Sequence, residues 1–504
     1  MARMTAGPPD SLREQAIQGA KWVTLSRIAC EATAFAAMLA LARLLTPAEV
    51  GHAAVAMVAF TLANGILAGS FGSPLIKTEH IDDRQVEVAS LLSIASGLGL
   101  TALCVVTGLV LRPVLVPTTG DMVVLAAPGF LFASLAAVPQ ALRSRRLAFQ
   151  AIMIVEVAST VAGAAAGVAL AVGGAGSAAM VLGAVVTTAV AAALSPIGVG
   201  FRLPRWHREA AGPILRFGVP ASASSVFSTA ERNIDYALIS ARLAPTQVGL
   251  YYRAFTLAVD YQLKISNIVL RVLFPVLSRA KSQASFRTAR SRVIRLHSVV
   301  LFPLLTMLLV TAPEVVPLLF GEAWRGSIVP TQILVGAGIA TAIGTGIGPL
   351  MMAAGRPRAL LVNNGVSFAC FAVTVYVCSG YGLIATCIGV TAYRLVSTAV
   401  SQYVLATRLL GIPLRETLIL DPGPAAVSAL ALVAVALPVS TLLDPLPPVL
   451  DVAMTAAAGF AAYLVVLRTV FGGAWADAEM LLTRLVPARL RRPAAVAARV
   501  GPEA

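Results

Sequence analysis

The chain has 504 residues, of which 58% are hydrophobic and only 12% are charged, and its mean hydropathy is +0.85. This composition excludes an ordinary soluble domain and predicts an integral membrane protein. A net charge of +15 is typical of proteins that bind nucleic acid, but the positions of the basic residues, given below, argue against such a partner.

Apolar runs of about 20 residues, the length that crosses a bilayer as a helix, follow one another along the chain. In order they span 21–44, 48–70, 88–111, 122–141, 150–172, 176–199, 213–241, 247–272, 292–312, 328–354, 359–379, 382–407, 424–443 and 449–470. They are too long and too uniformly apolar for a membrane β-barrel. The sequence therefore predicts an all-α integral membrane protein with about 14 transmembrane helices.

The basic residues are distributed unevenly between the predicted loops. If the N-terminus is cytoplasmic, 29 of the 38 Lys and Arg residues fall in inner segments, and only Arg43, Arg112, Arg242 and Arg325 fall in outer ones. This positive-inside asymmetry predicts that both termini face the cytoplasm. The positive charge is then explained by the orientation of the chain in the membrane and by contact with anionic membrane lipids, and no nucleic-acid partner is expected. All four tryptophans fall at or just beyond the ends of runs and are expected to anchor in the interface: Trp22, Trp206, Trp324 and Trp475.

Two segments about two hundred positions apart are nearly the same. ARLLTPAEVG occupies Ala42–Gly51 and ARLAPTQVG occupies Ala241–Gly249, each at the end of one run and the start of the next. A second pair, PQALRSRRLAF at 139–149 and LMMAAGRPRAL at 350–360, repeats at a similar distance. Such repeats are typical of transporters built from two related bundles. The alternative is that A-R-L-x-x-P is simply a common way to end a membrane helix.

The repeat divides the chain into lobes. An even number of runs separates the copies, which predicts two parallel six-helix lobes related by an axis along the membrane normal, with a cavity between them. The predicted parts are a cytoplasmic segment 1–20, an N-lobe 21–200, a linker 201–212, a C-lobe 213–410, an appended helix pair 411–470 and a cytoplasmic basic tail 471–504.

Ionisable residues occur inside the runs, where each costs about 2.5–3.5 kcal/mol at a helix centre. They are therefore expected to face water or each other in a polar chamber between the lobes. Arg253, Asp260 and Lys264 stand seven and then four residues apart, which predicts one helix face. The predicted substrate-binding set, with two asparagines for sugar hydroxyls, is Arg27, Glu31, Asn64, Arg232, Asn233, Asp235, Arg253, Asp260, Lys264 and Arg394.

The alternative for these charges is structural. Arg27 with Glu31, and Asp260 with Lys264, have the spacing of ion pairs within one helix, and Glu156 lies near enough to a run end to reach the inner interface. Arg253 and Arg394 have no acid three or four residues away. Since Arg binds a phosphate through two parallel hydrogen bonds, a phosphate headgroup is the expected ligand of these two. The five cysteines form no C-x-x-C pair, and no metal site is predicted.

The chain resembles the polysaccharide-type flippases of the multidrug/oligosaccharidyl-lipid/polysaccharide exporter superfamily, which include Wzx-like O-antigen, exopolysaccharide and teichuronic-acid transporters. The segments that carry the resemblance are ARLLTPAEVG with SPLIKTEHID (73–82), QALRSRRLAF (140–149), NIDYALISARLAPTQVGLYYRA (233–254), RVLFPVLSR (271–279) and VVPLLFGEAW (315–324). The family's Asn-x-Asp motif falls on Asn233 and Asp235.

The resemblance implies alternating access and the flipping of an undecaprenyl-pyrophosphate-linked oligosaccharide across the bacterial inner membrane for surface polysaccharide synthesis, by a transporter and not an enzyme. Other polysaccharide-assembly proteins are further expected partners. A nucleotide-binding loop G-x-x-x-x-G-K-[ST] is missing from the sequence, so coupling to ATP and a cofactor are not expected. Asp235 or Asp260 would instead bind a proton or a sodium ion from the gradient.

Two other functions remain open from sequence. A cation-coupled multidrug exporter shares the two-lobe plan but favours acids over cations in its cavity. A membrane-embedded glycosyltransferase or polymerase needs a long outer loop with catalytic carboxylates, and the predicted outer loops are short, with isolated acids such as Glu314 and Glu322.

Overall fold

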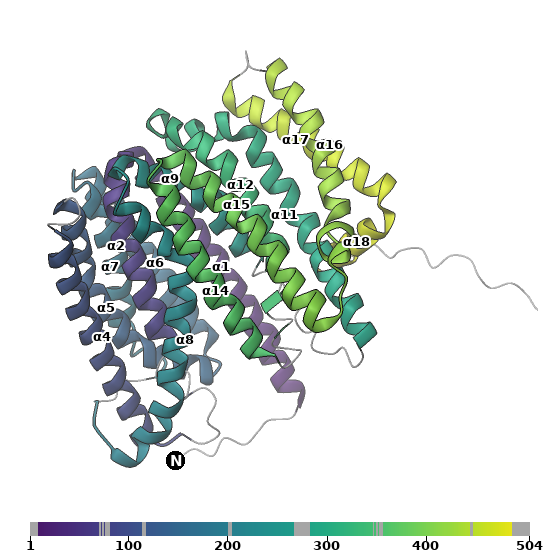
Figure 1. The fold of residues 1–504 in the computed structure, drawn as a ribbon. Coiled ribbons are helices and arrows are strands. Elements are labelled where there is room, and N and C mark those ends of the chain that lie inside the picture. Colours follow the sequence, from purple (N-terminus) through teal and green to yellow (C-terminus); the bar gives the residue numbers. More distant parts are fainter. Residues whose placement is uncertain are drawn as a thin grey trace, which may run out of the picture. The chain divides into compact units, whose positions relative to one another are not determined.

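The computed structural model describes residues 9–69, 72, 75, 81–112, 117–199, 204–266, 283–345, 347–348, 351, 356–443 and 447–485. Among these residues every regular element is a helix (Figure 1). Each of the predicted runs coincides with a described helix for most of its length. Ten of the described helices are long and apolar enough to cross a membrane, and shorter apolar helices span Pro47–Leu62 and Ser177–Ala193. The all-α membrane fold is therefore confirmed, while the number of fourteen spans stays a prediction.

The chain divides into two compact units. Unit 1 comprises Met1–Arg253, Leu319–Gly326 and Ala372–Thr386, and unit 2 comprises Ala254–Leu318, Ser327–Phe371 and Cys387–Ala504. Unit 1 thus includes three segments that the repeat assigns to the second lobe, namely 213–253, 319–326 and 372–386. The lobe boundaries stay a prediction, because they rest on the sequence similarity between two parts of the chain, whereas the units rest on which residues pack together.

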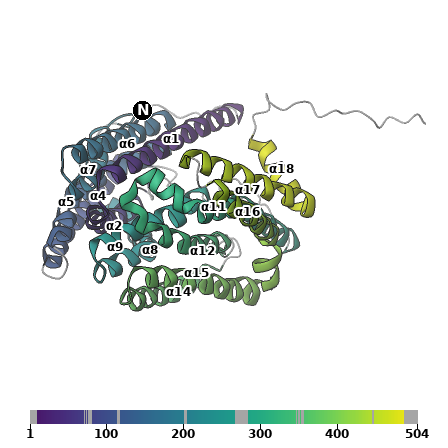
Figure 2. The same ribbon diagram turned by 90° about the horizontal axis from the view of Figure 1, so that it is seen from above.

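The helices of unit 1 pack in neighbouring pairs: α4 lies along α5, α6 along α7 and α1 along α6, the last visible in Figure 2, and α2 packs on α5 and α8. The bounds are α1 Pro9–Leu44, α2 Pro47–Gly69, α4 Asp83–Leu111, α5 Pro117–Arg145, α6 Phe149–Val172, α7 Ser177–Ala193, α8 Arg208–Ser240 and α9 Pro245–Phe255. Small residues allow the closest of these approaches, as is usual in membranes. Gly163 of α6 faces Gly183 of α7, for example.

Unit 2 contains the long helix α11 up to Leu318. The elements of this unit are the π-helical segment η1 Thr256–Asp260, α11 Gln283–Phe320, α12 Ile328–Gly344, α14 Pro357–Ser379, α15 Leu383–Ser401, π-helical η3 Gln402–Arg408 and η4 Glu416–Leu420, α16 Gly423–Leu443, α17 Pro448–Val470 and α18 Gly472–Leu485. The short 3-10 helix η2, Glu322–Ser327, joins α11 to α12. The unit boundary cuts through these elements. The last two residues of α11, Leu319 and Phe320, belong to unit 1, and the last residue of η2, Ser327, belongs to unit 2.

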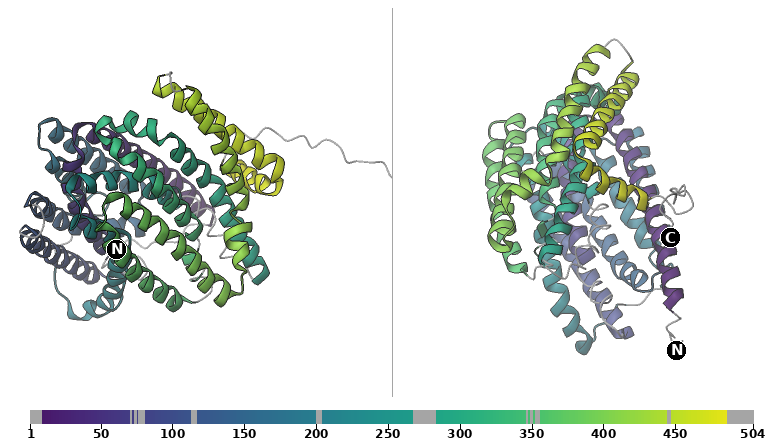
Figure 3. Two further views of the ribbon diagram at one scale, coloured as in Figure 1. Left: turned by 45° about the horizontal axis from the view of Figure 1, so that its top comes forward. Right: turned by 90° about the vertical axis from the view of Figure 1, so that its right-hand side faces the viewer.

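The appended pair α16–α17 packs as an antiparallel hairpin (Figure 3). It shares a hydrophobic core with α11, which includes Leu301, Leu432 and Tyr463. Tyr463 is 1% exposed and its hydroxyl donates to the carbonyl of Val299 at 3.0 Å. The chain then continues into α18, a helix at the start of the segment that the sequence predicts as a basic tail.

The N-terminal boundaries of several helices follow from local chemistry. Proline occupies the first position of α2 and α9, where its missing N–H costs no hydrogen bond. At α2 the preceding Thr46 and the third helical residue Glu49 form a capping box. The Glu49 carboxylate accepts from the Thr46 N–H at 2.8 Å, and the Thr46 hydroxyl accepts from the Glu49 N–H at 3.3 Å.

Candidate functional site

A cavity of about 290 Å³ lies inside unit 1, between α1, α5, α6 and α7. Its polar lining comes from Arg27, Gln140, Arg143, Glu156, Ser159 and Thr160. Such a mixed cationic and hydroxyl lining at membrane depth suits a polar or anionic ligand better than an apolar one.

The two arginines of this cavity differ in their freedom to meet a ligand. Arg143 is 2% exposed, and its Nη1 donates to the carbonyls of Ser195 at 3.0 Å and Ile197 at 3.4 Å. It therefore ties α5 to the end of α7. Arg27 is exposed on α1, so its guanidinium is the accessible cation of the cavity.

Glu156 also lines this cavity, although the sequence favours its reaching the inner interface. Its carboxylate accepts from the Ser26 hydroxyl of α1 at 3.4 Å, and Ser26 is buried. Glu31, one turn further along α1, is half-buried. The cavity thus joins one accessible cation, Arg27, with the carboxylate of Glu156.

The predicted asparagines each use one donor inside their own helix. Asn64 of α2 donates through Nδ2 to the carbonyl of Phe60 at 3.0 Å, and Asn233 of α8 donates to the carbonyl of Thr229 at 2.8 Å. Both side chains are half-buried. The predicted binding of sugar hydroxyls would have to use the remaining amide atoms.

Two predicted site residues are deeply buried in unit 1. Asp235 of α8 is 0% exposed and accepts from the hydroxyl of Tyr251 at 2.8 Å. Arg253 of α9 is 3% exposed, so its guanidinium is not accessible to a headgroup in this structure. The side chain of Arg232, next to the Asn233–Asp235 motif, lies outside the described residues.

A π turn separates Arg253 from Asp260 and Lys264, so the expected common helix face does not extend to Arg253, while for Asp260 and Lys264 it stays a prediction. The expectation assumes 3.6 residues per turn, but Thr256–Asp260 forms a π-helix, whose wider turn changes the phase of everything that follows. Accordingly Arg253 is buried, Asp260 is half-buried, and Lys264 is exposed with its ammonium 4.9 Å from the Tyr261 ring centroid. Single sequences give no reliable signal for such a π turn.

Arg394 of α15 belongs to unit 2. Its guanidinium carbon lies 4.8 Å from the ring centroid of Phe371 on α14, a cation–π distance. Its Nε is buried and has no hydrogen-bond partner within the described part of the chain. The Nε donor of Arg394 can therefore meet a ligand only after the side chains around it move.

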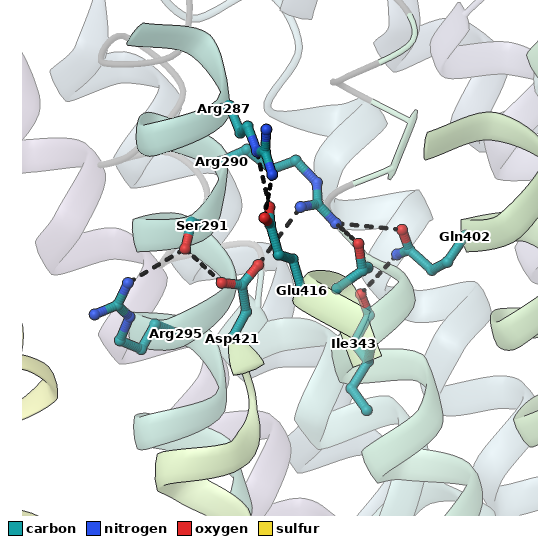
Figure 4. Close-up of polar contacts among 9 residues, drawn as sticks. Arg287, Arg290, Ser291, Arg295, Ile343, Gln402, Glu416 and Asp421 are labelled. Atoms are coloured by element: carbon teal, nitrogen blue, oxygen red, sulfur yellow. Dashed lines mark hydrogen bonds and ion pairs between the residues drawn. The ribbon is translucent and has the colours of Figure 1, made fainter. Parts of the chain in front are cut away.

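A polar network that the sequence did not predict joins α11 to the segment before α16 (Figure 4). Arg290 and Asp421 are both nearly buried, with Nη1 and Oδ2 3.5 Å apart. Arg290 also donates through Nη2 to the hydroxyl of Thr417 at 2.6 Å, and Ser291 donates to Asp421. Sequence placed Asp421 in a loop, where an acid needs no partner, so nothing suggested a buried pair.

Trp324 corrects another expectation. It is 0% exposed and is not an interfacial anchor, because its ring packs inside unit 1 against Phe320, with the ring centroids 6.4 Å apart. Its indole N–H donates to the carbonyl of Ala42 at 2.7 Å. A position just after an apolar run suits both an interfacial and a buried tryptophan, so sequence alone did not separate them.

Comparison with known proteins decides the family. The family model described as "Polysaccharide biosynthesis protein" matches residues 40–329, more than half of the chain. The protein belongs to this family. The lipopolysaccharide biosynthesis protein WzxC of Escherichia coli strain K12 is 26% identical over 415 residues, covering 81% of this chain and 84% of WzxC. The teichuronic acid biosynthesis protein TuaB of Bacillus subtilis strain 168 is 24% identical over 363 residues, covering 69% of this chain and 73% of TuaB.

Two solved structures of transporters share the fold of this family member. The lipid II flippase MurJ in an inward closed conformation superposes with a TM-score of 0.68 at 12% identity, over 90% of this chain and 98% of MurJ. An inward-facing multidrug resistance transporter, a MATE family member of the MOP superfamily, gives a TM-score of 0.60 at 15% identity, over 77% of this chain and 96% of that chain. The resemblance seen in the sequence is confirmed, and the protein is a multi-pass membrane protein of a polysaccharide biosynthesis family.

Proposed function

We propose that this polysaccharide biosynthesis protein flips an undecaprenyl-pyrophosphate-linked oligosaccharide from the cytoplasmic to the outer leaflet of a bacterial inner membrane by alternating access. The names of WzxC and TuaB support a role in surface polysaccharide synthesis. The orientation with both termini in the cytoplasm rests on the distribution of basic residues.

The observation that carries the proposal is an accessible arginine at membrane depth. Arg27 is exposed on α1 and lines the cavity of unit 1. A cation at this depth is costly unless it meets water or an anion. We assign it to a phosphate group of the lipid carrier, which an arginine can bind through two parallel hydrogen bonds. Arg253 is not assigned to the headgroup, because it is buried in this state.

The coupling ion is the second part of the proposal. Asp235 is buried against Tyr251 and needs a rearrangement before it meets water, whereas Asp260 is half-buried. We therefore favour Asp260 over Asp235 as the carboxylate that binds a proton or a sodium ion between transport steps.

The test is flipping of the lipid-linked glycan in membrane vesicles. In a strain that lacks the gene, glycan-lipid should accumulate on the cytoplasmic leaflet, and the wild-type gene should restore accessibility to a glycan-cleaving enzyme added at the outer face. Arg27→Ala should slow flipping about 10- to 100-fold, since a hydrogen bond to a charged group contributes about 1.5–3 kcal/mol.

Arg84→Ala is the matched control, because Arg84 has a solvent-exposed side chain at the start of α4. Arg27→Lys keeps the charge and should retain part of the activity. If the glycan-lipid reaches the outer leaflet equally well without the gene, the proposed cargo is wrong. Increased drug sensitivity in that strain would instead favour multidrug export.

A further inference from the structure

The two copies of the repeated segment touch each other inside unit 1. Gly51 of α2 and Gly249 of α9 occupy equivalent positions, each four residues after the proline that starts its helix. A Cβ on Gly51 would overlap the carbonyl oxygen of Pro245, and a Cβ on Gly249 would overlap that of Pro47. The contact is therefore reciprocal, as an interface around a two-fold axis requires.

Only glycine permits this approach. The carbonyl carbons of Pro245 and Pro47 would lie 2.7 and 2.8 Å from the added Cβ atoms, inside the range that carbon atoms tolerate. The obstructing atoms are backbone, which cannot rotate away as a side chain does. The repeat thus places its two glycines where the helices cross in direct backbone contact.

Trp324 forms a hydrogen bond at the same end of unit 1 as the two glycines. Its indole N–H donates at 2.7 Å to the carbonyl of Ala42, the first residue of the first copy. That carbonyl belongs to the last turn of α1, whose acceptors have no partner within the helix. The bond is fully buried, so α1 and the segment after α11 are held together by a donor that water does not compete for.

Arg253 supports Trp324 from α9. Its guanidinium carbon lies 4.8 Å from the ring centroids of both Trp324 and Phe320. Both rings are nearly fully buried, and in such surroundings cation–π attraction reaches about 2 kcal/mol. The charge of Arg253 therefore draws α9 and the aromatic pair together.

We propose that Gly51, Gly249, Trp324 and Arg253 form the outer gate of the transporter, closed in this structure. The proposal rests on the alternating-access function proposed above and on the predicted orientation, which places this end outside. Opening separates α2 from α9 and breaks the Trp324–Ala42 hydrogen bond. Because glycines meet without interdigitating side chains, the two helices part without repacking, and Trp324 supplies the specific bond that holds the closed state.

The test measures exposure of a buried position near the gate, independently of transport. Ala54 is 0% exposed and lies one turn after Gly51, on the same side of α2. A cysteine at Ala54, in a chain whose five native cysteines are replaced, should react slowly with a membrane-impermeant maleimide added outside. Gly51→Ala and Gly249→Ala should each raise the labelling rate at least tenfold. Gly99→Ala is the control, because a Cβ there meets nothing within 4 Å.

A second variant keeps the test decisive if a glycine substitution prevents folding. Trp324→Phe keeps an aromatic ring but removes the N–H donor, and should raise the labelling rate about three- to tenfold, as the loss of one hydrogen bond implies. Trp206→Phe is its control, since Trp206 is 55% exposed.

The outcomes separate the gate from the cargo. Unchanged labelling in Trp324→Phe and in every glycine variant that folds overturns the gate, even if the protein flips the lipid-linked glycan. If the Gly51, Gly249 or Trp324 variants label faster but the wild type does not flip the glycan-lipid, the gate proposal stands and the proposed cargo is wrong. The gate proposal is also overturned if Gly99→Ala or Trp206→Phe raises the labelling rate at position 54 equally, because the increase would then not be specific to the gate residues.

Discussion

Removal of the Arg290 side chain should destabilise unit 2 strongly. The Arg290 and Asp421 side chains are each 5% exposed, and their closest polar atoms are 3.5 Å apart. Breaking a buried ion pair by deleting one partner costs about 3–5 kcal/mol, since the other charge stays buried. Because Ser291 still donates to Asp421, we expect about 3 kcal/mol, the lower end of this range, for Arg290→Ala.

A double substitution separates the charge from the packing. Arg290→Met with Asp421→Leu replaces both charges by apolar groups and should return the free energy of unfolding to within about 1 kcal/mol of wild type. Arg287→Ala is the surface control. The Arg287 side chain is 46% exposed in its pair with Glu416, and exposed pairs contribute about 0–1 kcal/mol.

The assay is denaturant unfolding of the purified protein in detergent micelles, followed by tryptophan fluorescence. The reasoning is refuted if Arg290→Ala is no more destabilising than Arg287→Ala. It is also refuted if the double variant remains as unstable as Arg290→Ala, because the loss would then come from packing and not from an uncompensated charge.

Two further substitutions test the packing of unit 1 by the same unfolding assay. Gly163→Ala should destabilise the protein by about 1–3 kcal/mol, because its Cβ would lie 2.6 Å from the carbonyl oxygen of Gly183. Gly365→Ala is the control and should be neutral, because a Cβ there meets no atom within 4 Å. If the two variants are equally stable, the predicted clash at Gly163 is contradicted. Tyr251→Phe removes the donor that reaches buried Asp235 at 2.8 Å and should cost about 1.5–3 kcal/mol, a loss below 0.5 kcal/mol being inconsistent with a charged acceptor.

The sequence predicted the helices well because membrane depth imposes a simple pattern. A run such as 150–172 has to satisfy its backbone internally, so its length and apolarity alone identify a helix, and α6 spans Phe149–Val172. The repeated segments were recognised for a similarly local reason. Proline at the first helical position and glycine four residues later appear in both copies, although their contact could be seen only in three dimensions.

The candidate site was harder to predict, because a charge in a run has several ways to be satisfied. Arg27 and Arg253 both lie inside apolar runs, yet one is exposed beside a cavity and the other is buried against two aromatic rings. Which partner meets a charge depends on tertiary contacts between distant segments, such as the 282 residues that separate Ala42 from Trp324. The contacts of Asp421 depend on α11 in the same way.

The π-helical segment Thr256–Asp260 has a consequence for how this part of unit 2 can move. It holds one residue more than an α-helical stretch of the same length needs. If the π turn with its extra residue shifts by one turn along the helix, the residues that it passes rotate by about 100° around the helix axis. During this shift each backbone N–H exchanges its carbonyl acceptor for the neighbouring carbonyl. A polar side chain such as Asp260 can therefore move between two environments while the helix stays hydrogen-bonded.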